Sequence, residues 1–381
     1  MAERKSTFLY PREIEKYPYP PECPFNTSRP QKARKILKSM GLLSGENISE
    51  IDPGPADRIS LKKFHSAKYL HILKNASRKK SDIEAMRMGL GTEDCPIFEG
   101  MYEYSSLACG ATLAGAELII TGKTEVAFNA SGGLHHAMPE RASGFCYMND
   151  MALACIVLAE AGKKVLYLDI DVHHGDGVAY AFYDRADIMT ISLHQSGRSL
   201  FPGTGFEDEI GTGDGKGYCI NLPLPVGTYD EAYMRVFVSV AVPLIKTFEP
   251  DVFVFELGAD GLAGDPLANL CLTNNVYAEI IEYLLGFNKP ILATGGGGYN
   301  IDNTARAWAL AWSIFAKADS KQDMNLGSGG VMLESTDWQG GFRDRELAVN
   351  NQQRDAVRPV IEATIETVKK KVFSIHGLTA R

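Results

Sequence analysis

The sequence contains no apolar run of about 18 residues or more, and its opening, MAERKSTFLY, has no apolar core of the kind that a secretory signal carries. We therefore expect a protein that neither crosses a membrane nor enters the secretory route. Its seven cysteines include no C-x-x-C pair. That argues against a thiolate zinc site and for reduced thiols in a cytoplasmic protein.

Positive charge is also scarce, because the chain has 39 Lys and Arg residues but 47 Asp and Glu residues, which gives a net charge of −8. This balance argues against direct binding to nucleic acid. No linker-like tract or internal repeat interrupts the chain. We expect one domain over residues 1–381, with a motif-bearing core at about 20–320 and a helical tail at about 320–381. The charge and the lack of apolar tails fit a monomer or small homo-oligomer.

Several short apolar segments bounded by glycine or polar residues predict buried strands. They are VAFNA (Val126–Ala130), VLYLDIDV (Val165–Val172), IMTISLH (Ile188–His194), DVFVFELG (Asp251–Gly258) and PILATGG (Pro290–Gly296). Apolar-periodic stretches beginning at Met151, Tyr233 and Val276 predict helices between them. Such alternation favours an α/β fold whose central, mostly parallel sheet has helices on both faces.

Polar and glycine-rich clusters follow these predicted strands. Five of the eight histidines lie in strand ends or the loops after them: His135, His136, His173, His174 and His194. In parallel α/β sheets the site lies beyond the carboxyl ends of the strands. The clusters therefore predict an active site at that edge.

The segment LDIDVHHGD, Leu168 to Asp176, carries the strongest metal signal. Residues two apart on a strand share a face, so Asp169, Asp171 and His173 are expected to point one way. With Asp260 after another strand, Asp171 and His173 would supply two oxygen ligands and one nitrogen ligand. Three protein ligands and an open position are typical of catalytic zinc, although Fe²⁺, Mn²⁺ or Co²⁺ also suits such ligands.

Other side chains at this edge fit hydrolysis of an amide. The adjacent pair His135–His136, near the spare carboxylates Asp169 and Asp176, could supply a general base and a general acid. GGGGYN lacks the glycine spacing of a nucleotide loop and presents Tyr299, whose hydroxyl could stabilise an oxyanion. Phe145 and Phe201, in separate loops, could wall a slot for an aliphatic chain.

Together, HHAMPERASGFCYMND, LDIDVHHGDGV, SLHQSGRSLFPGTG, GADGLAGDPL and GGGGYN resemble the successive signatures of the zinc-dependent histone deacetylase superfamily, which has the arginase/deacetylase fold. The resemblance is greatest to bacterial histone deacetylase-like or acetoin-utilisation proteins. It runs in order from about Cys23 to Arg306. It implies hydrolysis of Nε-acetyl-lysine, or another Nε-acyl-lysine, in proteins.

The resemblance also implies individual roles. The zinc ligands would be Asp171, His173 and Asp260, and the catalytic histidines would be His135 and His136, with Asp169 and Asp176 as their carboxylate partners. Tyr299 would polarise the substrate carbonyl. The tunnel for the acyl-lysine would have Gly144, Phe145 and Phe201 as its walls, Asp94 at its rim and Arg29 at its foot. A structural K⁺ ion is implied near Asp169, Asp171, His173, Ser192 and Leu193. His136 is the expected base and His135 its electrostatic partner.

Three other interpretations remain open at this point. An arginase-like binuclear manganese hydrolase would need a carboxylate at Gly258. An acetylpolyamine amidohydrolase would share the chemistry, but some relatives of that kind carry glutamate where this chain has Leu267. A binding protein with an inactive site would need a broken ligand set. Pro266 stands where members of large corepressor complexes have an inositol phosphate-binding arginine, which argues against those partners.

Overall fold

The computed structural model describes residues 4–78, 83–317 and 341–379. Eight strands form one sheet: β1 (Ser6–Leu9), β2 (Ile48–Ile51), β3 (Val126–Asn129), β4 (Val165–Asp169), β5 (Ile188–Gln195), β6 (Cys219–Leu224), β7 (Val252–Glu256) and β8 (Ile291–Thr294). Their order is β2-β1-β3-β8-β7-β4-β5-β6, and every pairing is parallel. All carboxyl ends therefore meet at one edge, as the sequence predicted.

Helices cover both faces of this sheet. The α-helices are α1 (Arg29–Ser39), α2 (Arg58–Leu61), α3 (Ala67–Ala76), α4 (Ile83–Arg87), α5 (Met101–Ile120), α6 (Asp150–Glu160), α7 (Asp176–Ala181), α8 (Asp230–Val236), α9 (Val242–Phe248), α10 (Asn274–Gly286), α11 (Ile301–Phe315) and α13 (Asn351–Val372). Short 3₁₀ turns are η1 (Arg12–Lys16), η2 (Gly213–Gly215) and η5 (Phe373–His376), and η3 (Phe237–Ala241) is a π-helical segment.

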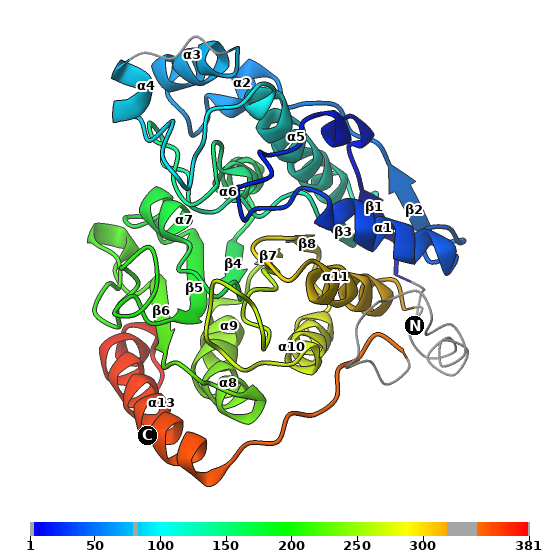
Figure 1. Ribbon diagram of the computed structural model, residues 1–381. Coiled ribbons are helices and arrows are strands. Elements are labelled where there is room, and N and C mark those ends of the chain that lie inside the picture. The colour runs from blue at the N-terminus through cyan, green and yellow to red at the C-terminus, as the bar shows by residue number, and fades with distance from the viewer. Residues whose placement is uncertain (1–3, 79–82, 318–340, 380–381) are drawn as a thin grey trace.

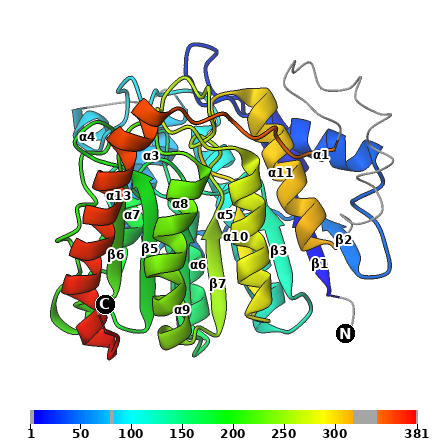
Figure 2. The same ribbon diagram turned by 90° about the horizontal axis from the view of Figure 1, so that it is seen from below.

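The two faces bury different side chains of the same strands. On β7, Phe253 and Phe255 pack with the cluster formed by α1, α8 to α11 and α13, whereas Val252 and Val254 pack with α5, α6 and α7. This is the period of two that an extended strand imposes. Figure 1 shows α5 and α6 on one side of the strands and α9, α10 and α11 on the other, and Figure 2 shows α8, α9, α10 and α13 lying across one face.

The predicted elements differ from the observed ones at their ends and at the sheet edges. All five predicted strands are present, but β4 ends at Asp169, so Asp171 and His173 lie in the loop beyond it. The helix predicted from Tyr233 begins at Asp230 and is interrupted by η3 before α9. Strands β1, β2 and β6 escaped prediction because they are short or carry polar residues in their apolar runs.

The predicted helical tail is present as α13 and η5. Helix α13 packs against β6, where the Thr364 hydroxyl donates to the Pro223 carbonyl at 3.2 Å. The first part of the predicted tail, residues 320–340, lies outside the described residues. Among the residues that are described, no helix combines the length and apolar character needed to span a bilayer.

Candidate active site

Asp171, His173 and Asp260 converge beyond the ends of β4 and β7. His173 Nδ1 lies 3.1 Å from Asp171 Oδ1 and 3.0 Å from Asp260 Oδ2. The three potential ligand atoms lie within 4.8 Å of one another, and all three residues are buried. One imidazole nitrogen and two carboxylate oxygens at this separation form a set that a divalent cation can bind.

Backbone amides and glycines hold this triad in place. The Gly297 amide donates to Asp171 Oδ2 at 2.7 Å, and the Val172 amide donates to Asp260 Oδ1 at 2.9 Å. A side chain at Gly258 would overlap the Asp171 carboxylate, and one at Gly297 would overlap that of Asp260. Glycine at position 258 is thus a packing requirement, which leaves no room there for the extra carboxylate of a binuclear site.

The electrostatics of the triad fit a cation. Burial lowers the pKa of His173, but hydrogen bonds to Asp171 and Asp260 outweigh it and raise that pKa to about 10. Burial and the charge of Asp171 raise the pKa of Asp260 to about 7. Two buried carboxylates facing each other are stabilised by positive charge, and a divalent ion supplies more of it than one proton. The residues present therefore fit a metal ion.

The two adjacent histidines form a connected pair beside the triad. His135 Nδ1 lies 3.0 Å from Asp169 Oδ2, and His136 Nδ1 lies 2.7 Å from Asp176 Oδ1. Their Nε2 atoms are 3.0 Å apart, so one hydrogen can lie between them. The pair therefore has one donor and one acceptor at this contact.

Opposite pKa shifts assign the donor and the acceptor. Burial lowers the pKa of His135, but the carboxylates of Glu256 and Asp169 outweigh it and raise that pKa well above its ordinary value. Burial, and then the charge of His135, lower the pKa of His136 to about 4. His136 is consequently neutral near pH 7, and its unprotonated Nε2 accepts the hydrogen that His135 donates.

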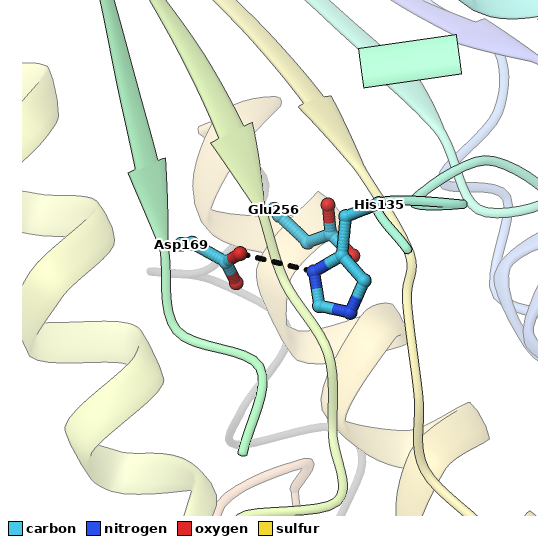
Figure 3. A group of neighbouring side chains, drawn as sticks. All are labelled: His135, Asp169 and Glu256. Carbon is cyan, nitrogen blue, oxygen red and sulfur yellow. Dashed lines mark hydrogen bonds and ion pairs between the residues drawn. The ribbon is translucent and has the colours of Figure 1, made fainter. Parts of the chain in front are cut away.

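Glu256, on β7, is a member of this site that the sequence did not reveal. Figure 3 shows the carboxyl groups of Asp169 and Glu256 both near the His135 ring, and Glu256 Oε1 lies 3.1 Å from Nδ1. The buried Tyr167 hydroxyl contacts both carboxylates, at 2.6 Å from Asp169 Oδ2 and 2.9 Å from Glu256 Oε2. The sequence feature that could have revealed it is that Glu256 is the single acidic residue inside the apolar run VFVFELG. Burial raises the pKa of Glu256 well above its ordinary range.

Aromatic rings surround the triad on its open side. The Tyr299 ring centroid lies 6.3 Å from that of His173 and 5.8 Å from that of Phe145. The Phe201 ring lies 5.0 Å from His136 and is 44% exposed. A side chain at Gly144, whose φ is +53°, would overlap the His136 ring. The region between these rings is called the approach to the triad below.

The remaining predicted residues lie around this approach. Asp94 accepts from the Gly144 amide at 2.8 Å, which ties the rim to the wall. Asp265, which the sequence did not single out, accepts from the amides of Leu267 and Tyr299 at 2.9 and 2.7 Å. Buried Arg29 donates to the Gly298 carbonyl at 2.7 Å, one residue before Tyr299.

The residues predicted to bind a monovalent cation are also neighbours. Asp169 pairs with Ser192 in the β4–β5 register, and Leu193 follows on β5. Asp171 and His173 lie in the loop directly after β4, and all five residues are buried. Each offers a carbonyl oxygen at the same sheet edge, which is the ligand type that a hard cation prefers.

The geometry just described can be compared with known proteins. The profile of the histone deacetylase domain matches residues 23–315. "Histone deacetylase 8" of Xenopus tropicalis is 41% identical over 288 residues, 75% of this chain and 77% of that protein. "Histone deacetylase 3" of Oryza sativa subsp. japonica is 38% identical over 314 residues, 82% of this chain but only 61% of that protein. The chain thus spans less than two thirds of the rice relative.

Solved structures of histone deacetylase homologs have the same fold as this chain. That of a histone deacetylase homolog from Aquifex aeolicus has a TM-score of 0.81 and 31% identity, and the match covers 95% of this chain and 100% of that one. A homolog complexed with SAHA has a TM-score of 0.82, also at 31% identity. The chain belongs to the histone deacetylase family. The named relatives include plant and animal proteins as well as the Aquifex protein, so a bacterial, acetoin-utilisation type stays a prediction.

Proposed function

We propose that this protein is a zinc-dependent amidohydrolase that removes the acetyl group from Nε-acetyl-lysine in proteins, releasing acetate and free lysine. One observation carries the proposal: a buried Asp–His–Asp triad lies beside two carboxylate-paired histidines and under the ring of Tyr299. Amide hydrolysis needs an activated water, a base, an acid and a donor for the oxyanion. This group of residues offers all four.

Asp171, His173 and Asp260 would hold the metal. A bound zinc ion would supply Lewis-acid polarisation of the amide carbonyl and acidification of water. Fe²⁺ or Co²⁺ is compatible with the same ligands. K⁺ is the proposed structural ion near Asp169 and Ser192, together with Leu193.

The protein's own groups then move the protons. Neutral His136 is the proposed base: its Nε2 would exchange the contact with His135 for the attacking water and take a proton from it, while Asp176 holds the proton on Nδ1. Charged His135 stabilises the negative charge that builds up on the substrate. The Tyr299 phenol, whose pKa burial raises well above its ordinary value, stays protonated and donates to the developing oxyanion. The imidazolium formed on His136 protonates the departing lysine amine.

The approach between Phe145 and Phe201 suits the aliphatic stem of lysine, with Gly144 leaving room for it. Asp94 would accept hydrogen bonds from substrate backbone amides at the rim, and Leu267 would line the mouth. Arg29 would hold the inner end through Gly298. The substrate is therefore an acetylated protein or peptide. Nucleic acid and membrane are not proposed partners.

The wider properties follow from composition and fold. We place the protein in the cytoplasm as a monomer or small homo-oligomer, with one catalytic domain that includes α13. The domain profile matches residues 23–315, and α13 lies beyond that match but packs on β6 of the same sheet.

A turnover assay tests the proposal. Purified protein is given acetyl-lysine peptides, with and without a chelator and after addition of Zn²⁺, Fe²⁺ or Co²⁺; N-acetylputrescine and N8-acetylspermidine run alongside. We expect peptide deacetylation that the chelator abolishes and a metal restores. Turnover of the polyamines alone would refute the lysine substrate, and metal-bound protein that hydrolyses neither class would refute the enzyme assignment.

A further inference from the structure

A cluster of buried aromatic side chains lies behind Phe145 and Tyr299. The Tyr19 ring centroid is 4.9 Å from Phe25, 4.8 Å from Phe98 and 5.0 Å from Tyr104. These rings are 9% exposed or less. Phe145 and Tyr299 are among the partly buried residues packed against the same apolar cluster. A substrate tunnel between Phe145 and Phe201 would therefore end against packed rings.

Phe25 is the member of this cluster whose ring contacts Phe145 of the expected tunnel wall. Its ring centroid is 6.0 Å from that of Phe145, and the Arg29 guanidinium carbon lies 4.4 Å from it. The same guanidinium lies 5.9 Å from the Tyr299 ring. Exposure falls from 44% at Phe201, near the mouth, to 6% at Phe25. Phe25 is thus a buried ring in contact with Phe145, whereas Phe201 is exposed.

The surroundings of Phe25 give the ring little freedom to move aside. The Tyr19 hydroxyl donates to the Phe145 carbonyl at 2.8 Å, so the ring behind Phe25 is fixed to the tunnel wall. Arg29, on its other side, is held by the carbonyls of Gly298 and Asn26. Close-packed interiors resist insertion of further methylene groups. An acyl chain longer than acetyl would have to displace this ring.

We propose that Phe25 sets the acyl-chain length by closing the inner end of the tunnel, which makes short acyl groups the preferred substrates. The proposal rests on the deacylase function proposed above. It assigns to Phe25 a role in specificity, and the chemistry remains with the histidines and Tyr299.

The test compares kcat/KM for acetyl-, butyryl- and octanoyl-lysine peptides in the metal-loaded enzyme. The wild type is expected to follow the order acetyl, butyryl, octanoyl. Phe25→Ala should raise the butyryl-to-acetyl ratio by roughly tenfold or more, since a methylene in an apolar pocket discriminates by about 10- to 200-fold. Phe25→Leu, which keeps most of the packing, should give a smaller rise in the same direction.

Phe98→Ala is the matched control. Phe98 belongs to the same cluster, and among the described residues its ring contacts are with Tyr19 and Tyr147. It removes equal aromatic volume without opening the tunnel, so its butyryl-to-acetyl ratio should match the wild type. Thermal melting of each variant records how much stability each has lost.

The outcomes separate the two proposals. A wild type with no chelator-sensitive turnover of any acyl-lysine refutes the deacylase function. A wild type that prefers octanoyl-lysine overturns the role of Phe25. The role of Phe25 is also overturned if the butyryl-to-acetyl ratio stays unchanged in both Phe25→Leu and folded Phe25→Ala. An equal rise of that ratio in Phe98→Ala overturns it too. If Phe25→Ala does not fold, the Phe25→Leu ratio decides.

Discussion

Two buried clusters in this protein have the same donors, one histidine and two carboxylates, yet their surroundings differ. In the first, Asp171, His173 and Asp260, the outer carboxylate oxygens accept from backbone amides, and the inner ones face His173. In the second, His135, Asp169 and Glu256, the Tyr167 hydroxyl contacts both carboxylates. The first cluster borders the Tyr299 ring and the approach, whereas the second lies beneath His136.

This difference shows why counting donors does not define a metal site. In the second cluster a side-chain hydroxyl, that of Tyr167, contacts the carboxylate oxygens that a metal would need. In the first, the hydrogens come from His173 and from backbone amides, and within the described part of the chain no side-chain hydroxyl contacts either carboxylate. We therefore assign the metal to the first cluster and the charged imidazole to the second.

The largest effect should come from removing a ligand of the first cluster. Asp260→Asn should lose bound metal and lower kcat/KM by about 10³-fold or more, since the metal supplies several kcal/mol of transition-state stabilisation. Asp169→Asn, in the second cluster, should keep its metal while losing activity. Elemental analysis should find one divalent ion per wild-type chain. Two ions, or metal lost from both variants, would contradict the assignment. Exposed Asp214→Asn is the control.

Next in size is removal of the Tyr299 hydroxyl beside the first cluster. Tyr299→Phe should lower kcat by about 10²- to 10³-fold, with KM and metal content nearly unchanged, because the lost hydrogen bond forms in the transition state. Steady-state kinetics on an acetyl-lysine peptide measures this. Tyr283→Phe, 42% exposed, should behave as wild type. A rise in KM with kcat intact would place Tyr299 in substrate binding.

A smaller effect, on stability, should follow from removing the hydroxyl of the second cluster. Tyr167→Phe leaves two buried carboxylates without this donor, which should lower the free energy of unfolding by about 1–3 kcal/mol. Urea unfolding of the metal-loaded enzyme gives the number. Tyr180→Phe, 63% exposed, serves for comparison. Equal stability of the two variants would mean that Tyr167 does not satisfy this pair.

The smallest expected effect concerns the pH dependence of the second cluster. Glu256 raises the pKa of His135. Glu256→Gln should therefore lower that pKa, so that His135 loses its proton at lower pH. The basic limb of kcat/KM should move down by about one pH unit, or about 1.4 kcal/mol. The acidic limb, set by His136 with a pKa of about 4, should stay. An unmoved basic limb would show that Glu256 already carries a proton.

The central sheet was predictable because its strands are continuous apolar runs with glycines at their ends, as in β7 and β8. Strands β2 and β6 were not, because ISEI and CINLPL carry Glu50, Asn221 and Pro223 within them. The metal triad and the histidine pair could be predicted because they lie in polar clusters that directly follow predicted strands. Glu256 and Phe25 were not, since each acquires its role from a distant segment: Asp169 on the neighbouring strand, and Phe145 beyond α5.

The sheet order also bears on how the chain folds during synthesis. Strand β8 lies between β3 and β7. Before Thr294 is made, the sheet can exist only as two parts, β2-β1-β3 and β7-β4-β5-β6, each with an open edge where β8 will insert. Open edges of apolar strands promote aggregation, and late, long-range parallel pairing is slow. A nascent chain arrested before β8 should therefore depend on chaperones.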